Sequence, residues 1–294
     1  MKHPVCTLFF LTIILMPSCT YDYHPVLEHH LREDMVVINA YLSPDQDIKA
    51  ELYKIACVAD GVKRQGLQNV SITLYEEERV LCKKLCDSVF LLPYKPVENR
   101  SYKIVVERDS KTYTAATVIP PKITNKVTMN ENKVTVSSFD AHPPFPLWIT
   151  ASIIFKNDSV IQFQELYSKD AFLDEINKEI TPFVIFSEFG NIYYDGFLRI
   201  SPVNISNVEA ISFYPSTNRS HILSDAKCIR ITLIRAGFEY DRYNRSSYQF
   251  FSGSLGDEFS PFFYQPKSIY SNIVNGVGIF AGYQVSHYDF PFKK

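Results

Sequence analysis

The sequence predicts an all-β, mainly antiparallel protein. We expect an N-terminal β-sandwich of immunoglobulin or transthyretin type, followed by a second strand-rich domain with one or two short helices. From residue 34 to 120, apolar and polar residues alternate with a period of two, as in half-buried strands. Pro120 and Pro121 then interrupt the pattern, because proline cannot donate to a strand ladder. These observations divide the folded part into a sandwich at 34–120 and a β-rich domain at 121–294.

Residues 1–18 have the pattern of a lipoprotein signal peptide. Lys2 precedes an apolar run at 5–16, which is too short for a transmembrane helix of about 20 residues. The run fits the apolar centre of a secretory signal, which has about 7 to 15 residues. Ser18 directly precedes Cys19, and this resembles the lipobox after which bacterial lipoproteins are acylated. An ordinary signal peptide with an incidental cysteine is the alternative. We expect Cys19 to carry the membrane anchor.

Residues 19–33 are predicted to form a tether, because they are polar, contain Pro25 and lack periodicity. His29 and His30 are adjacent and would point in different directions, so we expect no metal site there. The net charge of −2 and the absence of basic runs give no argument for nucleic-acid binding.

Four strand faces are expected in the first domain, and a hairpin turn is expected at 108–110. Turn residues also occur at 44–45 and 60–61. The residues that share a buried face in each strand are Val36, Ile38, Ala40 and Leu42; Ile48, Ala50 and Leu52; Val70, Ile72 and Leu74; and Tyr102, Ile104 and Val106.

The second domain is expected to contain strands near 132–138, 147–155, 159–166, 183–188, 208–214 and 227–235. Two segments have helical spacing instead. The first is 169–180, which Pro182 would end. The second is 238–253, which places Tyr240, Tyr243, Ser247 and Phe251 on one face and has Gly253 as the expected stop.

Four cysteines remain after Cys6 is removed and Cys19 is acylated, namely Cys57, Cys82, Cys86 and Cys228. An exported chain can form disulfides. On one straight strand, Cys82 and Cys86 would lie about 13 Å apart, too far for a bridge. A tight turn through residues 83–85 would bring them together. We therefore keep two alternatives, a Cys82–Cys86 disulfide and free buried thiols.

The patterns of known catalytic and cofactor sites are absent, so we expect no cofactor, no metal and no enzymatic activity. The glycines near the C-terminus have the spacing G-x-G-x-x-x-G, which differs from a dinucleotide fingerprint, and no helix fits after them. The acid pairs Asp174–Glu175 and Asp257–Glu258 resemble glycosidase carboxylates in type. Surface acids are the simpler interpretation of both pairs.

The segment 271–284 is expected to be a structural closing strand. Asn275–Gly276 is a favourable turn pair. Gly278 and Gly282 would share one face of the strand and admit a close neighbour, with Ile279 on the opposite face. Gly278→Val should therefore disturb packing rather than catalysis. The aromatic residues Phe262, Phe263, Tyr264 and Tyr270 either fill the core or form an exposed binding patch.

The combination of these segments resembles a family of Bacteroidota outer-membrane-associated lipoproteins, domain of unknown function 4249. The resemblance covers residues 34 to 288. Its most specific element is the pattern S-N-I-x-x-G-x-G-I-F-x-G, carried by Ser271, Asn272, Ile273, Gly276, Gly278, Ile279, Phe280 and Gly282. The resemblance implies no catalytic residues and no ligand. It implies an accessory lipoprotein that works with a TonB-dependent outer-membrane receptor in uptake.

In that context, Ser88 and Ser159 stand in D-S-apolar triplets, which resemble O-glycosylation acceptors of exported Bacteroidota proteins. The first functional hypothesis is a lipid-anchored binding or accessory protein of the outer membrane, on either its surface or its periplasmic face. The alternatives are an exported hydrolase acting on glycan or peptide, and a structural envelope or adhesion protein.

Overall fold

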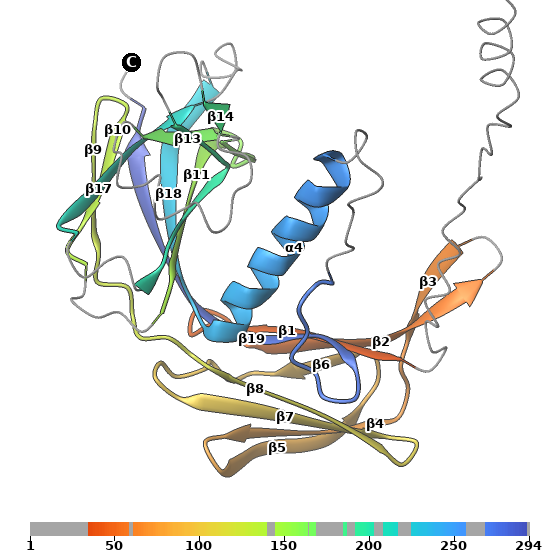
Figure 1. The fold of residues 1–294 in the computed structure, drawn as a ribbon. Helices are drawn as coiled ribbons and strands as arrows, with labels where there is room; N and C mark the ends of the chain where they lie inside the picture. The colour runs from red at the N-terminus through yellow and green to blue at the C-terminus, as the bar shows by residue number, and fades with distance from the viewer. Residues whose placement is uncertain are drawn as a thin grey trace, which may run out of the picture.

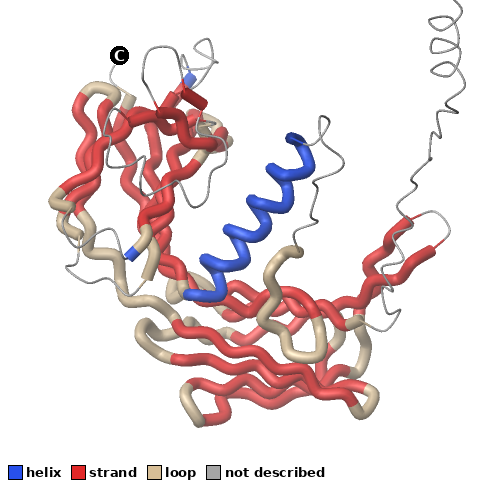
Figure 2. The backbone as a smooth tube through the Cα atoms, in the orientation of Figure 1, coloured by secondary structure: helices blue, strands red, loops and turns tan. Residues whose placement is uncertain are grey.

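A computed structural model describes residues 35–58, 61–139, 145–163, 165–168, 185–186, 192–202, 208–216, 225–256 and 268–292. Within these ranges the chain is built from strands, together with the single long helix α4 (Phe238–Gly256). Figure 2 shows this predominance of strands around the long helix. The predicted all-β, mainly antiparallel class is confirmed, and β1 and β19 form a parallel pair.

The largest sheet has nine strands and runs through the whole molecule (Figure 1). Its order is β12-β11-β18-β19-β1-β2-β3, with β16 paired to β11 and β6 paired to β2. The strands are β1 (Val36–Leu42), β2 (Ile48–Val58), β3 (Gly61–Gly66), β6 (Val89–Leu92), β11 (Leu147–Phe155), β12 (Val160–Gln162), β16 (Phe197–Ile200), β18 (Ala226–Ala236) and β19 (Val277–Pro291).

Two smaller antiparallel sheets pack against the two halves of the large one. The first has the order β5-β4-β7-β8 and the second has the order β14-β15-β13-β17-β10-β9. Their strands are β4 (Val70–Glu76), β5 (Arg79–Cys86), β7 (Ser101–Arg108), β8 (Lys111–Val118), β9 (Lys126–Asn130), β10 (Lys133–Ser137), β13 (Glu165–Ser168), β14 (Ile185–Phe186), β15 (Ile192–Asp195) and β17 (Ala210–Ser216).

The first sandwich encloses the core that the alternating pattern predicts. All the residues assigned above to its four faces are buried, and they form one apolar cluster between β1 and β2 on one side and β4 and β7 on the other. The hairpin between β7 and β8 turns at Asp109 and Ser110. Both have positive φ, 48° and 63°, as a two-residue hairpin turn of the primed type requires.

The second sandwich has its own core between β11 and β18 of the large sheet and β10, β13 and β17 of the facing sheet. The predicted strands at 147–155 and 227–235 correspond to β11 and β18. Both supply residues that are completely buried, including Ile149 and Leu233. Apolar residues from the two sheets meet in this core, as in other sandwiches.

Strand β19 belongs to both sandwiches. Residues 277–282 pair with β1, and residues 283–291 pair with β18. Ile273 and Phe280 lie in the core of the first sandwich. The expected division at 120/121 is therefore wrong for the C-terminal segment, because a parallel pairing across the length of the chain leaves no local pattern. Pro120 and Pro121 do lie between β8 and β9, outside any strand.

Helix α4 lies in the angle between the two sandwiches (Figure 1). It confirms the helix predicted at 238–253 but continues to Gly256, three residues beyond the expected stop at Gly253. The other predicted helix, 169–180, lies outside the described residues.

Candidate functional site

Four tyrosines cluster where α4 meets the nine-stranded sheet. Tyr240 and Tyr243 come from the first two turns of α4, Tyr41 from β1 and Tyr283 from β19. The rings of Tyr240 and Tyr283 stack with centroids 5.1 Å apart, and Tyr41 meets Tyr240 and Tyr243 edge-on at 6.0 and 6.3 Å. These are the favoured arrangements of aromatic pairs. Tyr41 remains 37 % exposed, so the cluster opens to solvent at that ring.

Strand alternation explains why these rings share one side of the sheet. Even-numbered residues of β1, such as Leu42, and Phe280 of β19 point into the core of the first sandwich. Odd-numbered residues point to the other side, where α4 packs. Tyr41 and Tyr283 are among them.

Polar groups border the cluster on the same side of the sheet. Asn39 Nδ2 donates to the hydroxyl of Tyr53 at 3.0 Å, and Gln46 Nε2 donates to the hydroxyl of Tyr283 at 3.1 Å. The guanidinium of Arg64 lies over the Tyr53 ring, 5.1 Å from its centroid. We call Tyr41, Tyr53, Tyr240, Tyr243 and Tyr283, with these bordering groups, the tyrosine surface.

Exposed aliphatic residues extend this surface across β6. Val89 and Leu91 are 45 % and 55 % exposed. They pair in register with Glu51 and Lys49 of β2, which places all four on the side of Tyr41. Lys49 and Glu51 form an exposed ion pair at 2.6 Å. Aromatic and aliphatic groups with a polar border are typical of binding surfaces rather than of catalytic centres.

The hydroxyls of Tyr41, Tyr240 and Tyr283 remain protonated at neutral pH, because the pKa of each is raised. Burial, followed by the charge of Tyr283, raises the pKa of Tyr240 to about 12. Burial is also the main cause of the raised pKa of Tyr41, with further contributions from Tyr243 and Tyr240. The pKa of Tyr283 is raised by burial and by Asp45. Each of these three hydroxyls can therefore donate or accept a hydrogen bond, and none of the three is suited to act as a base near pH 7.

A buried ion pair fixes the start of α4 to the second sandwich. Asp241 accepts hydrogen bonds from Arg199 Nε and Nη2, both at 2.7 Å, and from Trp148 Nε1 at 2.9 Å. Arg199 and Asp241 are only 4 % and 5 % exposed. Arg199 Nη1 is buried without a hydrogen-bond partner. This bidentate geometry holds the first turn of the helix in one orientation.

A second set of contacts fixes α4 to the first sandwich. Thr117 of β8 donates its hydroxyl to Glu239 Oε2 at 2.9 Å and accepts the backbone N–H of Gly282 at 2.8 Å. About one turn further along α4, the guanidinium of Arg242 lies 4.4 Å from the centroid of the Tyr270 ring. The tyrosine surface thus rests on a helix that is held by both sandwiches.

The segment 272–276 closes the open edge of β8. Asn272 Nδ2 donates to the carbonyl of Ala116, Val274 N–H donates to Thr114, and Asn275 Nδ2 donates to Thr112. These carbonyls alternate along β8, as the outward-pointing groups of an edge strand do. Asn272 also bonds both the N–H and the carbonyl of Phe280, and Ser271 Oγ accepts the N–H of Ile273.

The glycines of this segment lie where other backbone comes close. A Cβ on Gly278 would lie 2.2 Å from the carbonyl oxygen of Ile38, and its φ is +114°. A Cβ on Gly282 would lie 2.5 Å from the carbonyl oxygen of Val118, and one on Gly276 would lie 2.8 Å from that of Val36. Asn275 has a φ of 63° in the turn. Backbone therefore lies close to all three glycines, and a larger side chain at any of them would have to displace it.

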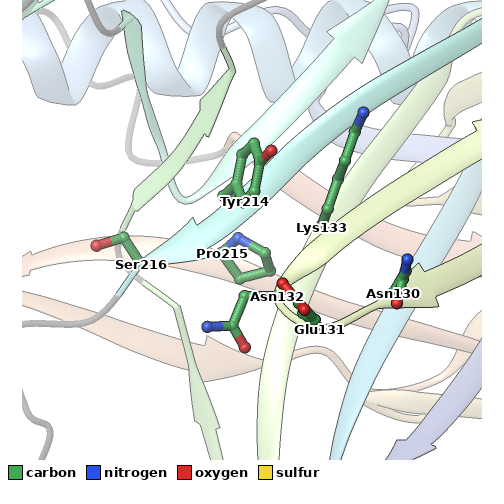
Figure 3. Close-up of a pocket in the computed structure, with 7 residues that line it drawn as sticks. All are labelled: Asn130, Glu131, Asn132, Lys133, Tyr214, Pro215 and Ser216. Atoms are coloured by element: carbon green, nitrogen blue, oxygen red, sulfur yellow. The ribbon is translucent and has the colours of Figure 1, made fainter.

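A polar depression of about 420 Å³ lies at the end of the second sandwich, between the β9–β10 turn and the end of β17. Figure 3 shows the residues that line it, which are Asn130, Glu131, Asn132, Lys133, Tyr214, Pro215 and Ser216. Glu131 is the only acid among these residues, and none of them is a histidine or a cysteine. This lining offers neither a carboxylate pair nor a nucleophile with its base.

A buried acid in the first sandwich has a structural environment. Glu76 is 6 % exposed and accepts hydrogen bonds from the hydroxyls of Tyr102 and Tyr94 and from Arg100 Nη1, at 2.5, 2.6 and 2.9 Å. Burial alone would raise the pKa of Glu76. The hydrogen bonds from Tyr102 and Tyr94 and the charge of Arg100 outweigh that effect and hold the pKa below its usual value.

Of the two alternatives kept for Cys82 and Cys86, the disulfide is not formed. Both residues lie on the continuous strand β5, opposite Leu74 and Val70, and both are free thiols. The tight turn that the bridge requires is absent because residues 83–85 continue the pairing with β4. Cys228 is a free buried thiol, and Cys19 lies outside the described residues.

The two candidate glycosylation residues differ in accessibility. Ser159 is exposed in the turn between β11 and β12, where its hydroxyl donates to Asn157 Oδ1 at 2.7 Å. Ser88 is half-buried and donates to the carbonyl of Leu67 at 3.4 Å. Glycosylation of either residue stays a prediction.

Other sequence candidates are only partly placed. Tyr270 is half-buried, while Phe262, Phe263 and Tyr264 lie outside the described residues, as do both acid pairs. Among the residues that the structure describes, no group of three or more His, Cys, Asp and Glu side chains is arranged to hold a metal. The one described helix lacks the apolar length that a membrane crossing requires.

Sequence reasoning found only part of the tyrosine surface and missed the ion pair below it. It placed Tyr240 and Tyr243 on one helix face but did not connect them with Tyr41 or Tyr283, which are remote in sequence. The single tryptophan, Trp148, and an arginine on an apolar strand, Arg199, were the available signals. Buried residues of these types usually need polar partners.

Comparison with known proteins places the chain in a family without an assigned activity. No curated protein matches it. One family model matches residues 20–289, and its description is "Domain of unknown function (DUF4249)". The match begins directly after Cys19 and includes both sandwiches and α4. The chain therefore belongs to the DUF4249 family.

Proposed function

We propose that the chain is an exported, lipid-anchored binding protein of the outer membrane, which works without catalysis beside a TonB-dependent receptor in uptake. The tyrosine surface carries this proposal. It combines half-exposed aromatic rings with hydrogen-bonding groups and both signs of charge, as sites of molecular recognition do. The signal-peptide pattern and the lipobox at Ser18–Cys19 support the anchored location.

The rigid base of the surface supports a binding role. Recognition is strongest when contact groups need little ordering on binding. Tyr240 is fixed between Tyr283 and Tyr41, and its helix is anchored one residue later at Asp241. Tyr41 presents its ring at the border of this fixed cluster.

An affinity purification tests the proposal. Full-length tagged chain is recovered from detergent-solubilised outer membranes of its own source, and the bound proteins are identified by mass spectrometry. We expect a β-barrel receptor to be enriched with the unaltered chain. Tyr41→Lys should lower its recovery at least about tenfold, because it replaces an exposed ring of the tyrosine surface with a flexible charge.

Leu85→Lys is the matched control, because Leu85 is 71 % exposed on β5 and lies outside the tyrosine surface. It should leave recovery unchanged. Failure to enrich any β-barrel with the unaltered chain would contradict the receptor partnership. If the Tyr41→Lys and Leu85→Lys variants recover equal amounts of the β-barrel receptor, the receptor binds another surface of the chain.

A further inference from the structure

Strand β19 has an unpaired edge in the second sandwich. Its partner β1 ends at Leu42, opposite Gly282. From Tyr283 to Pro291, β19 pairs with β18 on one side, and no strand of the described residues pairs with it on the other. Figure 1 shows this half of β19 running beside β18 toward the C-terminus.

Two hydrogen bonds at the ends of the β18–β19 ladder show which backbone groups of β19 point away from β18. Gly237 N–H donates to Gly282 O at 2.9 Å, and Phe292 N–H donates to Lys227 O at 3.3 Å. Hydrogen-bonded and non-bonded pairs alternate in an antiparallel ladder. The N–H and C=O groups of Val285, His287 and Asp289 therefore point away from β18.

Both outer strands of the four-stranded sheet are protected, whereas no strand of the described residues covers this edge of β19. Segment 272–276 covers β8, as described above. On β5, Lys83 and Lys84 are exposed, and Lys84 Nζ donates to the carbonyl of Leu91 at 2.6 Å. Lysines on an edge discourage further pairing. Residues 283–290 contain neither a lysine nor a proline, and their pairing with β18 has no bulge.

The side chains at this edge also leave apolar surface uncovered. Tyr288, Phe290 and Phe292 are only partly buried against the core of the second sandwich, as is Met129 of β9, the edge strand of the facing sheet. The hydroxyl of Tyr288 donates to the carbonyl of Asn125 at 2.8 Å. An added strand would thus gain both backbone hydrogen bonds and apolar contacts.

We propose that a second copy of this chain pairs antiparallel with this edge, with His287 opposite Asp289 of the second copy. The arrangement is self-complementary, because the symmetry places Asp289 opposite His287 of the second copy at the same time. It would form about six backbone hydrogen bonds between the outward-pointing residues. The inference is independent of the proposed function.

Charge distribution favours this register over the neighbouring one. Asp289 accepts two hydrogen bonds from Arg230, at 2.7 and 2.8 Å, and His287 Nδ1 lies 3.0 Å from Thr232 Oγ1. All four side chains lie on the same exposed side of the sheet. In the alternative register, His287 would lie opposite His287 of the second copy, and Asp289 would lie opposite Val285 of the second copy. No carboxylate would then meet an imidazole.

The first test measures association of the full chain in detergent by sedimentation velocity with the detergent density-matched. We expect twice the monomer mass at high concentration. His287→Pro should abolish the dimer, because it removes an outward N–H without removing a backbone hydrogen bond to β18. Its melting temperature should stay within a few degrees of the unaltered chain. A chain that stays monomeric at all concentrations would overturn the proposal.

A cysteine pair tests the register and does not depend on the proline variant. Directly opposed strand residues lie within disulfide range, whereas residues offset by two do not. Mixing His287→Cys with Asp289→Cys chains should give a disulfide-linked dimer at several-fold higher yield than either variant alone. Equal yields from the mixture and from the single variants would contradict the register. Cross-linking of His287→Cys to a different protein in cells, in place of the second copy, would contradict the proposed occupant.

Discussion

Replacing Asp241 with asparagine should destabilise the whole molecule strongly. Asp241 accepts three short hydrogen bonds from Arg199 and Trp148 at a site where both charged residues are almost completely buried. The change removes the negative charge and leaves the guanidinium of Arg199 buried without its counter-ion. Breaking such a pair from one side costs about 3–5 kcal/mol. That is a large part of the roughly 5–15 kcal/mol by which proteins are stable.

The assay is urea unfolding followed by tryptophan fluorescence. Trp148 is the only tryptophan and donates directly to Asp241, so its emission reports on this site. Asp158→Asn is the matched control, because Asp158 pairs with Lys227 at 3.1 Å while both side chains are mostly exposed. An exposed pair contributes at most about 1 kcal/mol.

A double variant separates the charge from the packing. Arg199→Met combined with Asp241→Leu removes both charges, and it should recover at least half of the loss caused by Asp241→Asn. Neutral surface changes typically alter the free energy of unfolding by no more than about 0.5 kcal/mol. If Asp241→Asn changes the free energy of unfolding by no more than this, the anchoring role of the ion pair is refuted.

Three further predictions concern the first sandwich and its closing segment. Gly278→Val should lower the free energy of unfolding by on the order of 3 kcal/mol, since φ of Gly278 is +114° and a Cβ would meet the carbonyl of Ile38. Denaturant titration measures this loss. Val274→Ala, at a position that is 56 % exposed, is the control. Asn272→Ala should speed hydrogen exchange at the N–H of Phe280, because Asn272 Oδ1 accepts a hydrogen bond from that N–H at 2.9 Å. An unchanged exchange rate would contradict the view that Asn272 protects this group. The pKa of Glu76 is depressed in the folded state, so the stability that its carboxylate contributes is complete above the ordinary value of 4.5 and is lost as the pH falls below it. Glu76→Gln should therefore weaken the loss of stability at acid pH. An acid loss of the same size in this variant would count against the assignment.

Local sequence patterns determined the parts of the fold that could be predicted. Ile38, Ile72 and Ile104 are buried because alternation in a strand is a local property that tertiary packing preserves. The helix at α4 was recognisable from the spacing of Tyr240 and Tyr243. Its end was not, because the helix runs past Gly253, and one glycine is a weak stop signal.

The remaining features depend on contacts between distant segments. Tyr41 reaches Tyr240 and Tyr283 only because β19 returns to pair with β1. The same parallel pairing places Phe280 in the first core and invalidates a simple boundary after residue 120. Periodicity identifies a strand, but it does not identify the strand's neighbour. The position of the tyrosine surface could therefore not be obtained from the sequence.

Site-specific photo-cross-linking in intact cells tests most directly whether the tyrosine surface is the binding surface of this protein. A photoreactive phenylalanine replaces Tyr41 in one strain and Leu85, on β5 outside this surface, in another. The account predicts a cross-link from position 41 to an outer-membrane β-barrel protein, and little or none from position 85. Absence of any β-barrel adduct at position 41, or equal adducts at both positions, would contradict it.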